Sequence, residues 1–256
     1  MKYKPVHPRS ESALIRSKLE RPPLPGRLVA RPRLVERLEK GRDGRVTLIA
    51  APAGYGKTTL ALQWLAQRTG DTAWVSLSHR ESEPERFASY LVTGIRNQRP
   101  GALAQTAALL DARTEPPWSY FCDVLLSEIA ALEEPLLLAL DDYHVIASRE
   151  VHELVVRMVE ELPETVCVVA LGRIDPPWPL GRWRGKGWLA ELRGRDLRFT
   201  PDEIRAYFNG RDGPSLDDAE IDGLGARTEG WAVGLQLARI SVAQASNPHE
   251  RARRFS

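Results

Sequence analysis

Short, almost wholly apolar runs alternate along this chain with longer segments that have the hydrophobic spacing of helices. Four runs have the length of strands that are buried on both faces, at residues 46–50, 72–77, 136–140 and 165–171. A weaker last strand is expected at 188–192 or at 197–199. Strands that alternate with helices call for a parallel sheet covered by helices on both faces.

From residue 200 the periodicity changes, because the helical segments 216–227 and 231–243 follow with no strand between them. Thr200 and Pro201 begin this part with a helix-capping residue and a proline at the first helical position. The pattern predicts three parts. They are an extended Pro- and Arg-rich lead-in at 1–28, an α/β domain at 29–199 and a small helical subdomain at 200–256.

The first apolar run leads directly into a glycine-bearing turn and the start of a helix. Residues 51–59 have the sequence APAGYGKTT, whose Gly-Lys-Thr is the end of a phosphate-binding P-loop. The usual pattern begins with glycine where this chain has Ala51, which is small enough not to obstruct the loop. A chance match in a surface turn is the alternative, but chance would not also place a buried strand before the turn and a helix after it.

The P-loop residues have distinct expected roles. Backbone N–H groups around Gly54 and Gly56 can point into a concavity at a helix N-terminus, where the helix dipole also favours an anion. Lys57 would neutralise the β- and γ-phosphates, and the hydroxyl of Thr58 would ligate Mg²⁺.

Two acidic residues close the apolar run 136–140. Asp141 is placed to hold the metal through water, and Asp142 could orient or deprotonate an attacking water. A loop start or a helix cap is the alternative role for such a pair. A P-loop upstream favours the catalytic interpretation.

Arg173 ends the strand expected at 165–171, at the carboxyl edge where open α/β folds bind ligands. A cation there can bind the γ-phosphate and report its loss, whereas a plain surface arginine is the alternative. His144 has no partners at metal-ligand spacing and is expected to orient its turn.

The tryptophans at 178, 183 and 188 lie among basic residues and could stack on nucleic acid. A role in covering the sheet edge or forming a partner surface is favoured over that one.

The composition describes a general class of protein but does not identify a function. The 36 Lys and Arg residues nearly balance the 34 Asp and Glu residues, and the net charge of +2 argues neither for a nucleic-acid binder nor for a membrane-surface protein. The first 45 residues are basic, which is interpreted as a solvated arm, and 81–164 is more acidic. A hydrophobic content of 43% over 256 residues supports a real core.

The two cysteines, Cys122 and Cys167, lie in apolar stretches without metal spacing, so buried thiols in a reducing compartment are expected. The N-terminus has no apolar segment of signal-peptide length, and the longest aliphatic run is 136–140. The expected location is therefore the cytoplasm, with no membrane partner.

Four motifs in order resemble one family. APAGYGKTT (51–59), ERFASYL (85–91), LDDYHVI (140–146) and TEGWAVGLQL (228–237) are similar to the nucleotide-binding module of the MalT-like, large ATP-binding LuxR-type transcriptional regulators. These regulators belong to the STAND class of signal transduction ATPases. The resemblance spans about residues 17–240, and the lead-in segments 18–22 and 28–31 also resemble the start of that module.

The resemblance implies a P-loop NTPase core of the additional-strand type, in which the strand before Arg173 separates the P-loop strand from the acid-bearing strand. It also implies a helical subdomain whose Gly-Trp-Pro turn closes on the nucleotide; here Ala232 replaces the proline. In the family the segment before the P-loop lines the adenine pocket. The residues expected to bind ATP or ADP are therefore Val29, Ala30, Arg31, Ala53, Gly54, Tyr55, Gly56, Lys57, Thr58 and Thr59.

The function implied is an ATP/ADP-binding switch with slow Mg²⁺-dependent hydrolysis, in which Lys57, Asp142 and Arg173 form the catalytic set. ATP would favour self-association and ADP a closed resting state, under the control of an unknown inducer. The chain stops after the helical subdomain and is expected to be a fragment, with DNA bound only through domains that it lacks. The alternatives are a fast AAA-type ATPase or kinase, and a nucleic-acid-binding protein that uses the basic and Trp-rich segments.

Overall fold

A computed structural model describes residues 14–26, 28–41, 44–112, 116–210, 215–245 and 247–253. Within them, five parallel strands form one sheet in the order β2-β3-β4-β1-β5. The strands are β1 (Val46–Ala50), β2 (Asp71–Ser76), β3 (Leu136–Asp141), β4 (Val166–Gly172) and β5 (Leu189–Arg193). The predicted parallel α/β sheet is confirmed, and the last strand lies at the first of the two positions considered.

The order of the strands brings three functional segments to one edge. Strand β4 pairs with β1 on one side and with β3 on the other, so the predicted separation of the P-loop strand from the acid-bearing strand is confirmed. Ala50, at the end of β1, is in register with Gly172 of β4 and Arg193 of β5. Because all five strands are parallel, the segments that follow them start at the same edge.

Helices cover both faces of the sheet because neighbouring residues of a strand point to opposite faces. Val46 and Leu48 belong to one buried core and Ile49 to the other. The first core includes side chains from α3 (Pro84–Gln98), α4 (Ala104–Asp111), α5 (Trp118–Ala130), α6 (Arg149–Glu161) and α7 (Leu180–Gly185). The second includes side chains from α1 (Pro32–Lys40), α2 (Lys57–Leu65) and α8 (Gly194–Leu197).

Short 3-10 turns complete the α/β part. They are η1 (Arg16–Lys18), η2 (His79–Ser82) and η3 (Tyr143–Val145). In η1, Lys18 bonds the buried carboxylate of Glu81 at 2.6 Å, so this part of the predicted extended lead-in is held against the domain. Residues 1–13 and 27 of that lead-in lie outside the described residues.

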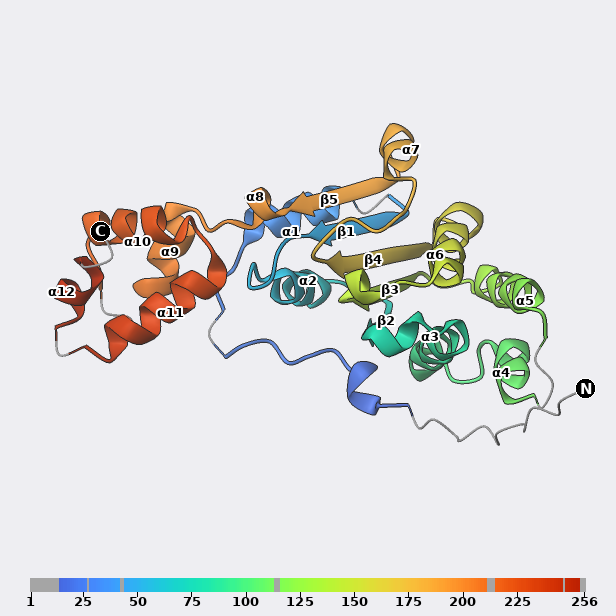
Figure 1. Cartoon of the computed structure of the whole chain (residues 1–256). Helices are drawn as coiled ribbons and strands as arrows, with labels where there is room; N and C mark the ends of the chain where they lie inside the picture. Colours follow the sequence, from blue (N-terminus) through green and yellow to red (C-terminus); the bar gives the residue numbers. More distant parts are fainter. Residues whose placement is uncertain are drawn as a thin grey trace, which may run out of the picture.

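The helices after residue 200 have a hydrophobic core of their own. They are α9 (Pro201–Phe208), α10 (Asp218–Thr228), α11 (Ala232–Ala243) and α12 (Pro248–Arg253). The predicted capped start is confirmed, because the Thr200 side chain accepts from the Glu203 N–H while the Glu203 carboxylate accepts from the Thr200 N–H. These helices gather beyond the arrowheads of β4 and β5 (Figure 1) and are called the helical unit below. Residues 211–214, 246 and 254–256 of the predicted subdomain lie outside the described part.

Two of the three tryptophans in the segment 178–188 belong to the core, whereas Trp188 is half-buried and lies under Arg45 and Lys186. Trp178 and Trp183 are buried, and their rings pack 5.7 Å apart in the core over the sheet. Cys122 is buried as expected, whereas Cys167 is only half-buried.

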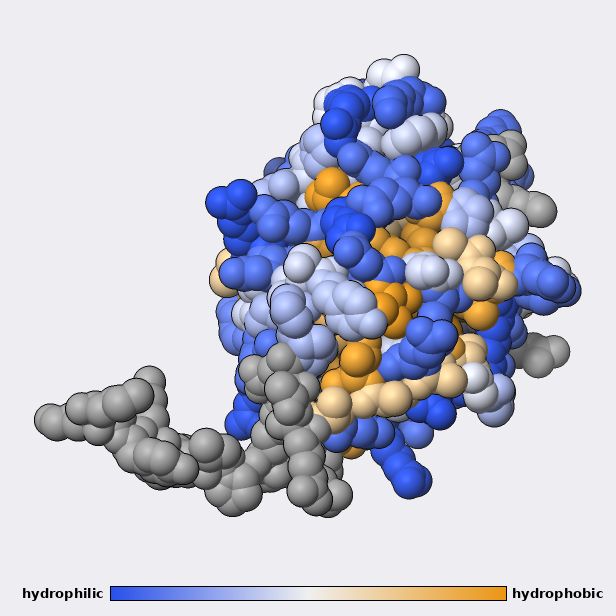
Figure 2. Space-filling model, turned by 90° about the vertical axis from the view of Figure 1, so that its right-hand side faces the viewer, coloured by the Kyte–Doolittle hydropathy of each residue, from blue (hydrophilic) through white to orange (hydrophobic). Residues whose placement is uncertain are grey.

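Figure 2 shows the face at the amino ends of the strands, where hydrophobic side chains are visible in the middle and polar ones around them. None of the helices in the described part of the chain combines the length and the apolar character that crossing a membrane requires.

Candidate functional site

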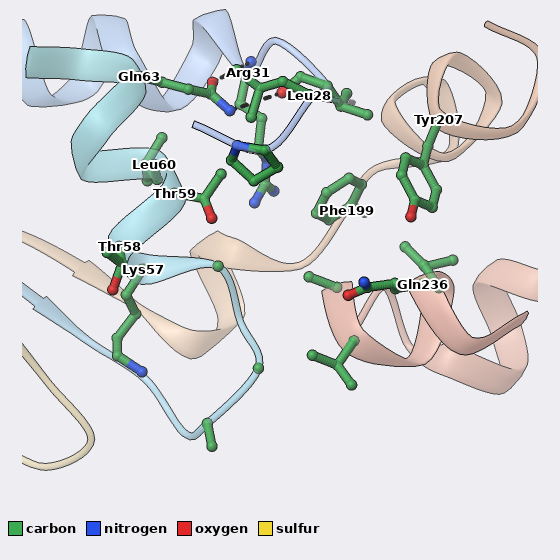
Figure 3. A pocket seen from close by; sticks show the side chains of 18 of the residues that line it. Leu28, Arg31, Lys57, Thr58, Thr59, Leu60, Gln63, Phe199, Tyr207 and Gln236 are labelled. Carbon is green, nitrogen blue, oxygen red and sulfur yellow. Dashed lines mark hydrogen bonds between the residues drawn. The ribbon is translucent and has the colours of Figure 1, made fainter. Parts of the chain in front are cut away.

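A cavity of ≈ 760 Å³ lies between the carboxyl edge of the sheet and the helical unit. Its walls come from the lead-in, from the P-loop with α2, and from α9 and α11 with the segment before α9 (Figure 3). The volume falls within the range of small-molecule and cofactor sites. The cavity is therefore the natural place to look for the predicted site residues.

Two glycines shape the P-loop. Gly54 has φ +78° and Gly56 has φ +77°. Residues other than glycine adopt this left-handed backbone conformation only at a cost in free energy. Gly56 is the N-cap of α2, which starts at Lys57. The loop therefore ends at a helix N-terminus, where free N–H groups and the helix dipole favour an anion.

Lys57 is folded against the loop. Its Nζ donates to the carbonyl of Ala51 at 2.8 Å and to that of Pro52 at 3.0 Å. Burial lowers the pKa of Lys57, and the charge of Asp142 opposes that effect. The ammonium group thus lies at the loop, and a phosphate there would replace carbonyl acceptors with a full negative charge.

Thr58 and Asp141 meet at the start of α2 and the end of β3. The Thr58 Oγ1 lies 3.2 Å from both carboxylate oxygens of Asp141. Burial, and next the charge of Asp142, raise the pKa of Asp141 to about 6. A positive charge nearby would favour the ionised Asp141 carboxylate and so lower this pKa again.

A hydroxyl beside a carboxylate suits Mg²⁺, which binds proteins through few oxygen ligands and keeps several waters or phosphates. The described residues include no cluster of three or more His, Cys, Asp or Glu that would hold a metal by protein groups alone. Thr58 and Asp141 therefore fit a Mg²⁺ that shares its ligands with a phosphate, rather than one held in a protein cage.

Asp142 and Arg173 also line the cavity, and both lie close enough to Lys57 for their charges to affect its pKa. Asp142 has φ +56°, and its side chain is 55% exposed. Strain of this kind in a non-glycine residue is typical of functional sites. His144 lies next to Asp142, with its Nδ1 3.8 Å from an Asp142 oxygen, and burial lowers the pKa of His144.

Arg31 has a role that sequence reasoning missed. Its guanidinium donates to the carbonyls of Leu197 and Arg198, at 2.8 Å each, and to the carboxylate of Glu203 at 3.0 Å. It also lies over the ring of Phe199, 4.3 Å from the centroid. Arg31 therefore joins the segment before the P-loop to the first helix of the helical unit.

Glu203 holds a second arginine as well. Arg33, in the first turn of α1, donates to it at 2.9 Å. The capping signal at Thr200 was visible in the sequence, but nothing marked Glu203 as the partner of two arginines about 170 residues away.

Gln63 of α2 fixes the lead-in from the other side. Its Oε1 accepts from the Arg31 N–H at 3.3 Å, and its Nε2 donates to the Val29 carbonyl at 3.0 Å. Both ends of this amide are thus used inside the protein.

The helical unit touches the P-loop directly. Trp231 Nε1 donates to the Ala53 carbonyl at 3.2 Å, and the Val233 N–H donates to the Gly54 carbonyl at 3.1 Å. A Cβ on Gly54 would lie 2.8 Å from Val233 Cγ2 and 2.9 Å from Trp231 Nε1. Gly54 is therefore needed both for the turn of the loop and for the approach of α11. The turn reaches the loop although Ala232 replaces the proline of the family pattern.

The structure brings most of the predicted site residues to one cavity. Those that line it are Val29, Arg31, Ala53, Gly54, Gly56, Lys57, Thr58, Thr59, Asp142 and Arg173. Three others, all within the described part, are not among its lining residues: Ala30, Tyr55 and Asp141. The lining residues that sequence reasoning missed include Gln63, Phe199, Tyr207, Gln236 and Arg239. The Gly-Trp motif was the one signal that pointed to this wall.

No family model matches the chain. Among curated proteins it is similar to the HTH-type transcriptional regulator MalT of Cronobacter sakazakii, with 36% identity over 95% of this chain and 27% of the relative. The MalT of Serratia proteamaculans is 34% identical over 91% of this chain and 26% of the relative. The chain spans about a quarter of the length of these relatives.

Solved structures share the fold. A STAND protein with a tetratricopeptide repeat sensor from Pyrococcus horikoshii superposes with a TM-score of 0.61 at 17% identity, over 84% of this chain and 30% of that one. Cdc6p of Pyrobaculum aerophilum gives a TM-score of 0.54 at 15% identity, over 94% of this chain and 70% of that one. At such identities the likeness shows a P-loop NTPase fold and no more.

Proposed function

This chain is a MalT-like region with a P-loop NTPase fold, and we propose that it binds ATP or ADP with Mg²⁺ as the switch module of a transcriptional regulator. One observation carries the proposal. The same cavity is lined by the P-loop, by Asp142 and Arg173 at the sheet edge, and by α11 of the helical unit. A ligand that fills it would contact both parts of the molecule at once.

The phosphates would lie at the P-loop. The N–H groups at the start of α2 would donate to them, and Lys57 would exchange its bonds to the Ala51 and Pro52 carbonyls for bonds to the β- and γ-phosphates. Arg173 would bind the γ-phosphate from the end of β4, where its charge can stabilise the transition state.

Thr58 and Asp141 would hold Mg²⁺, Asp141 through water. When bound, the metal supplies a positive charge that offsets the charge developing on the phosphates. Asp142 would orient a water or accept its proton, and its half-exposed carboxylate on the cavity wall, close enough to act on the charge of Lys57, supports this role.

The origin of the cavity walls in two separate units supports a switch over a fast enzyme. A ligand shifts an equilibrium between two arrangements only if it binds one of them better. Here the nucleotide would contact a helical unit that already rests on the P-loop through Trp231 and Val233. We propose that ADP favours this closed arrangement, that ATP favours an open, self-associating one, and that slow hydrolysis resets the module.

Direct binding tests the site. ATP and ADP are titrated into the wild-type chain with Mg²⁺, and mass spectrometry identifies any nucleotide that is released from the purified protein. Lys57→Ala is expected to weaken binding at least about 100-fold, because each tenfold loss corresponds to about 1.4 kcal/mol and a charge-assisted contact is lost. Lys40→Ala, in the last turn of α1 and away from the cavity, is the matched control. Unchanged ATP affinity in Lys57→Ala would show that the loop is not the phosphate site.

The rate of ATP hydrolysis and the oligomeric state of the protein test the proposed switch. Steady-state hydrolysis without an activator is expected to stay well below about one per second, at the low end of enzyme rates. Many turnovers per second would support a fast P-loop ATPase instead. Sedimentation in ATP and in ADP should show larger species with ATP, and identical profiles would contradict nucleotide-controlled self-association.

A further inference from the structure

Figure 3 shows Leu28, Phe199, Tyr207 and Gln236 on the side of the cavity away from Lys57, which is called the ring end below. Apolar side chains that line the cavity come from three separate segments: Leu28 and Val29 of the lead-in, Leu60 of α2, and Leu235 and Ile240 of α11. Apolar walls accept a ring system, and a small number of polar groups then decide which ring binds. The polar groups at this end are therefore the ones to compare.

Most polar atoms of the lead-in wall are already used, and the buried Arg31 Nε is the exception among those of Arg31 and Gln63. Gln63 accepts from the Arg31 N–H and donates to the Val29 carbonyl. The Arg31 guanidinium is occupied by two carbonyls and by Glu203. This wall offers a ring its apolar surface, whereas these polar atoms hold the protein together.

Arg239, on the opposite wall, is engaged as well. It donates to the carbonyl of Tyr207, and its guanidinium lies 4.9 Å from the centroid of the Tyr207 ring. Both arginines that line this end are therefore held by protein groups.

Gln236 differs from these residues. It lines the cavity from α11, and Figure 3 shows its amide pointing from α11 into the space in front of α2. Gln236 is exposed, and within the described parts of the chain its side chain makes no hydrogen bond to protein groups. Val233, which bonds the P-loop, precedes it by three positions, so both lie on the same face of the helix.

The chemistry of a primary amide fits one purine better than the other. On its N7 edge adenine can pair two-fold with a glutamine amide, which donates to N7 and accepts from the 6-amino group. On the same edge guanine presents two acceptors, N7 and O6, so the amide oxygen would face another acceptor. An amide placed at the ring end of the cavity thus favours adenine.

We propose that Gln236 contacts the base of the bound nucleotide and makes the site prefer adenine to guanine. This inference rests on the proposed nucleotide site. It adds that base selection comes from the helical unit, one helical turn from its contact with the P-loop. Selection of the base and docking of α11 would then be parts of one event.

The test removes separately the side-chain amide of Gln236 and the 6-amino group of the base. Wild type, Gln236→Leu and Gln244→Leu are titrated with ATP, GTP and purine riboside triphosphate, which lacks the 6-amino group. Gln244 caps the same helix and is not among the lining residues, so its variant is the matched control. Leucine preserves the size and the helix propensity of the side chain.

The wild type and Gln244→Leu should bind ATP about tenfold or more tightly than either other ligand, since a good amide–adenine pair contributes about 1–3 kcal/mol of discrimination. Gln236→Leu should lose ATP affinity by that factor and bind all three ligands about equally.

Three results would overturn the inference. The first is an unchanged preference for ATP in Gln236→Leu, and the second is a wild type that binds the three ligands equally well. The third is an equal loss of affinity for all three ligands in Gln236→Leu, which would place the contact at the ribose or the phosphates. In each of these cases nucleotide binding through Lys57 would still stand. If the wild type bound none of the ligands, the proposed function itself would fail, and this inference with it.

Discussion

The two ends of the cavity are built in different ways. The phosphate end comes largely from one continuous stretch, the P-loop and the start of α2, together with residues that directly follow β3 and β4. The ring end is assembled from the lead-in, α2 and the helical unit, which lie far apart in the sequence. Local backbone and sheet topology therefore determine the first end, whereas the second depends on how separate units dock.

This difference explains which predictions the sequence supported. Alternating apolar runs predict the parallel sheet because a buried strand must be apolar on both faces. Parallel strands then bring the segments after β1, β3 and β4 to one edge without further information. Lys57, Asp142 and Arg173 could thus be grouped from the sequence, although their catalytic roles stay predictions.

The ring end could not be derived in this way. Arg31 was expected near the base, and it does line the cavity, but its guanidinium is bound to Glu203 and two carbonyls. That contact joins residues 172 positions apart, and no periodicity or capping signal encodes it. Likewise, two hydrogen bonds connect the turn at Ala232 to the loop although the proline of the family pattern is absent.

The largest effect is expected at the buried ion pair between Arg31 and Glu203, which joins the segment before the P-loop to the helical unit. Glu203→Gln removes the charge that neutralises Arg31, whose side chain is 4% exposed. An uncompensated buried charge is costly, so we expect a loss of about 3 kcal/mol in the free energy of unfolding, measured by urea denaturation. Glu229→Gln, which breaks the exposed pair with Arg198, is the matched control and should cost at most about 1 kcal/mol.

The same variant predicts a change in pH dependence. Burial would raise the pKa of Glu203, but hydrogen bonds from Arg33, Arg31 and the Thr200 N–H hold it below its usual 4.5. A carboxylate with a lowered folded-state pKa stabilises the protein above its unfolded pKa, and that stability is lost as the pH falls through the folded-state value. The wild type should therefore lose this contribution below pH 4.5, and Glu203→Gln should lack that loss. Equal acid sensitivity of the two proteins would contradict the ion pair.

A smaller effect should distinguish the backbone conformation of the P-loop from the contact of the loop with α11. Gly54→Ala and Gly56→Ala both place a side chain at positive φ, at a cost of about 1–2 kcal/mol. Only the new Cβ at position 54 would meet Val233 and Trp231, since at position 56 the nearest atom is 4.0 Å away. Hydrogen exchange should therefore increase in α11 for Gly54→Ala and stay near the wild-type level for Gly56→Ala. Equal exchange in the two variants would mean that the helical unit does not depend on the loop for its position.

The smallest effect concerns the side-chain half of that contact. Trp231→Phe keeps an aromatic side chain and removes the Nε1–H that donates to the Ala53 carbonyl, while the Val233 N–H still bonds Gly54. A single exposed hydrogen bond contributes about 0.5–1 kcal/mol, so ADP affinity should fall only about two- to fivefold. Trp118→Phe, in the stacked pair with Phe121 on α5, is the control and should leave ADP affinity unchanged. An increase in the hydrogen exchange of α11 as large as that in Gly54→Ala would show that the indole rather than the helix backbone holds the two units together. The contact would then depend on one side chain that the Gly-Trp motif makes visible in the sequence, and the ring end would be more predictable than its dispersed origin suggests.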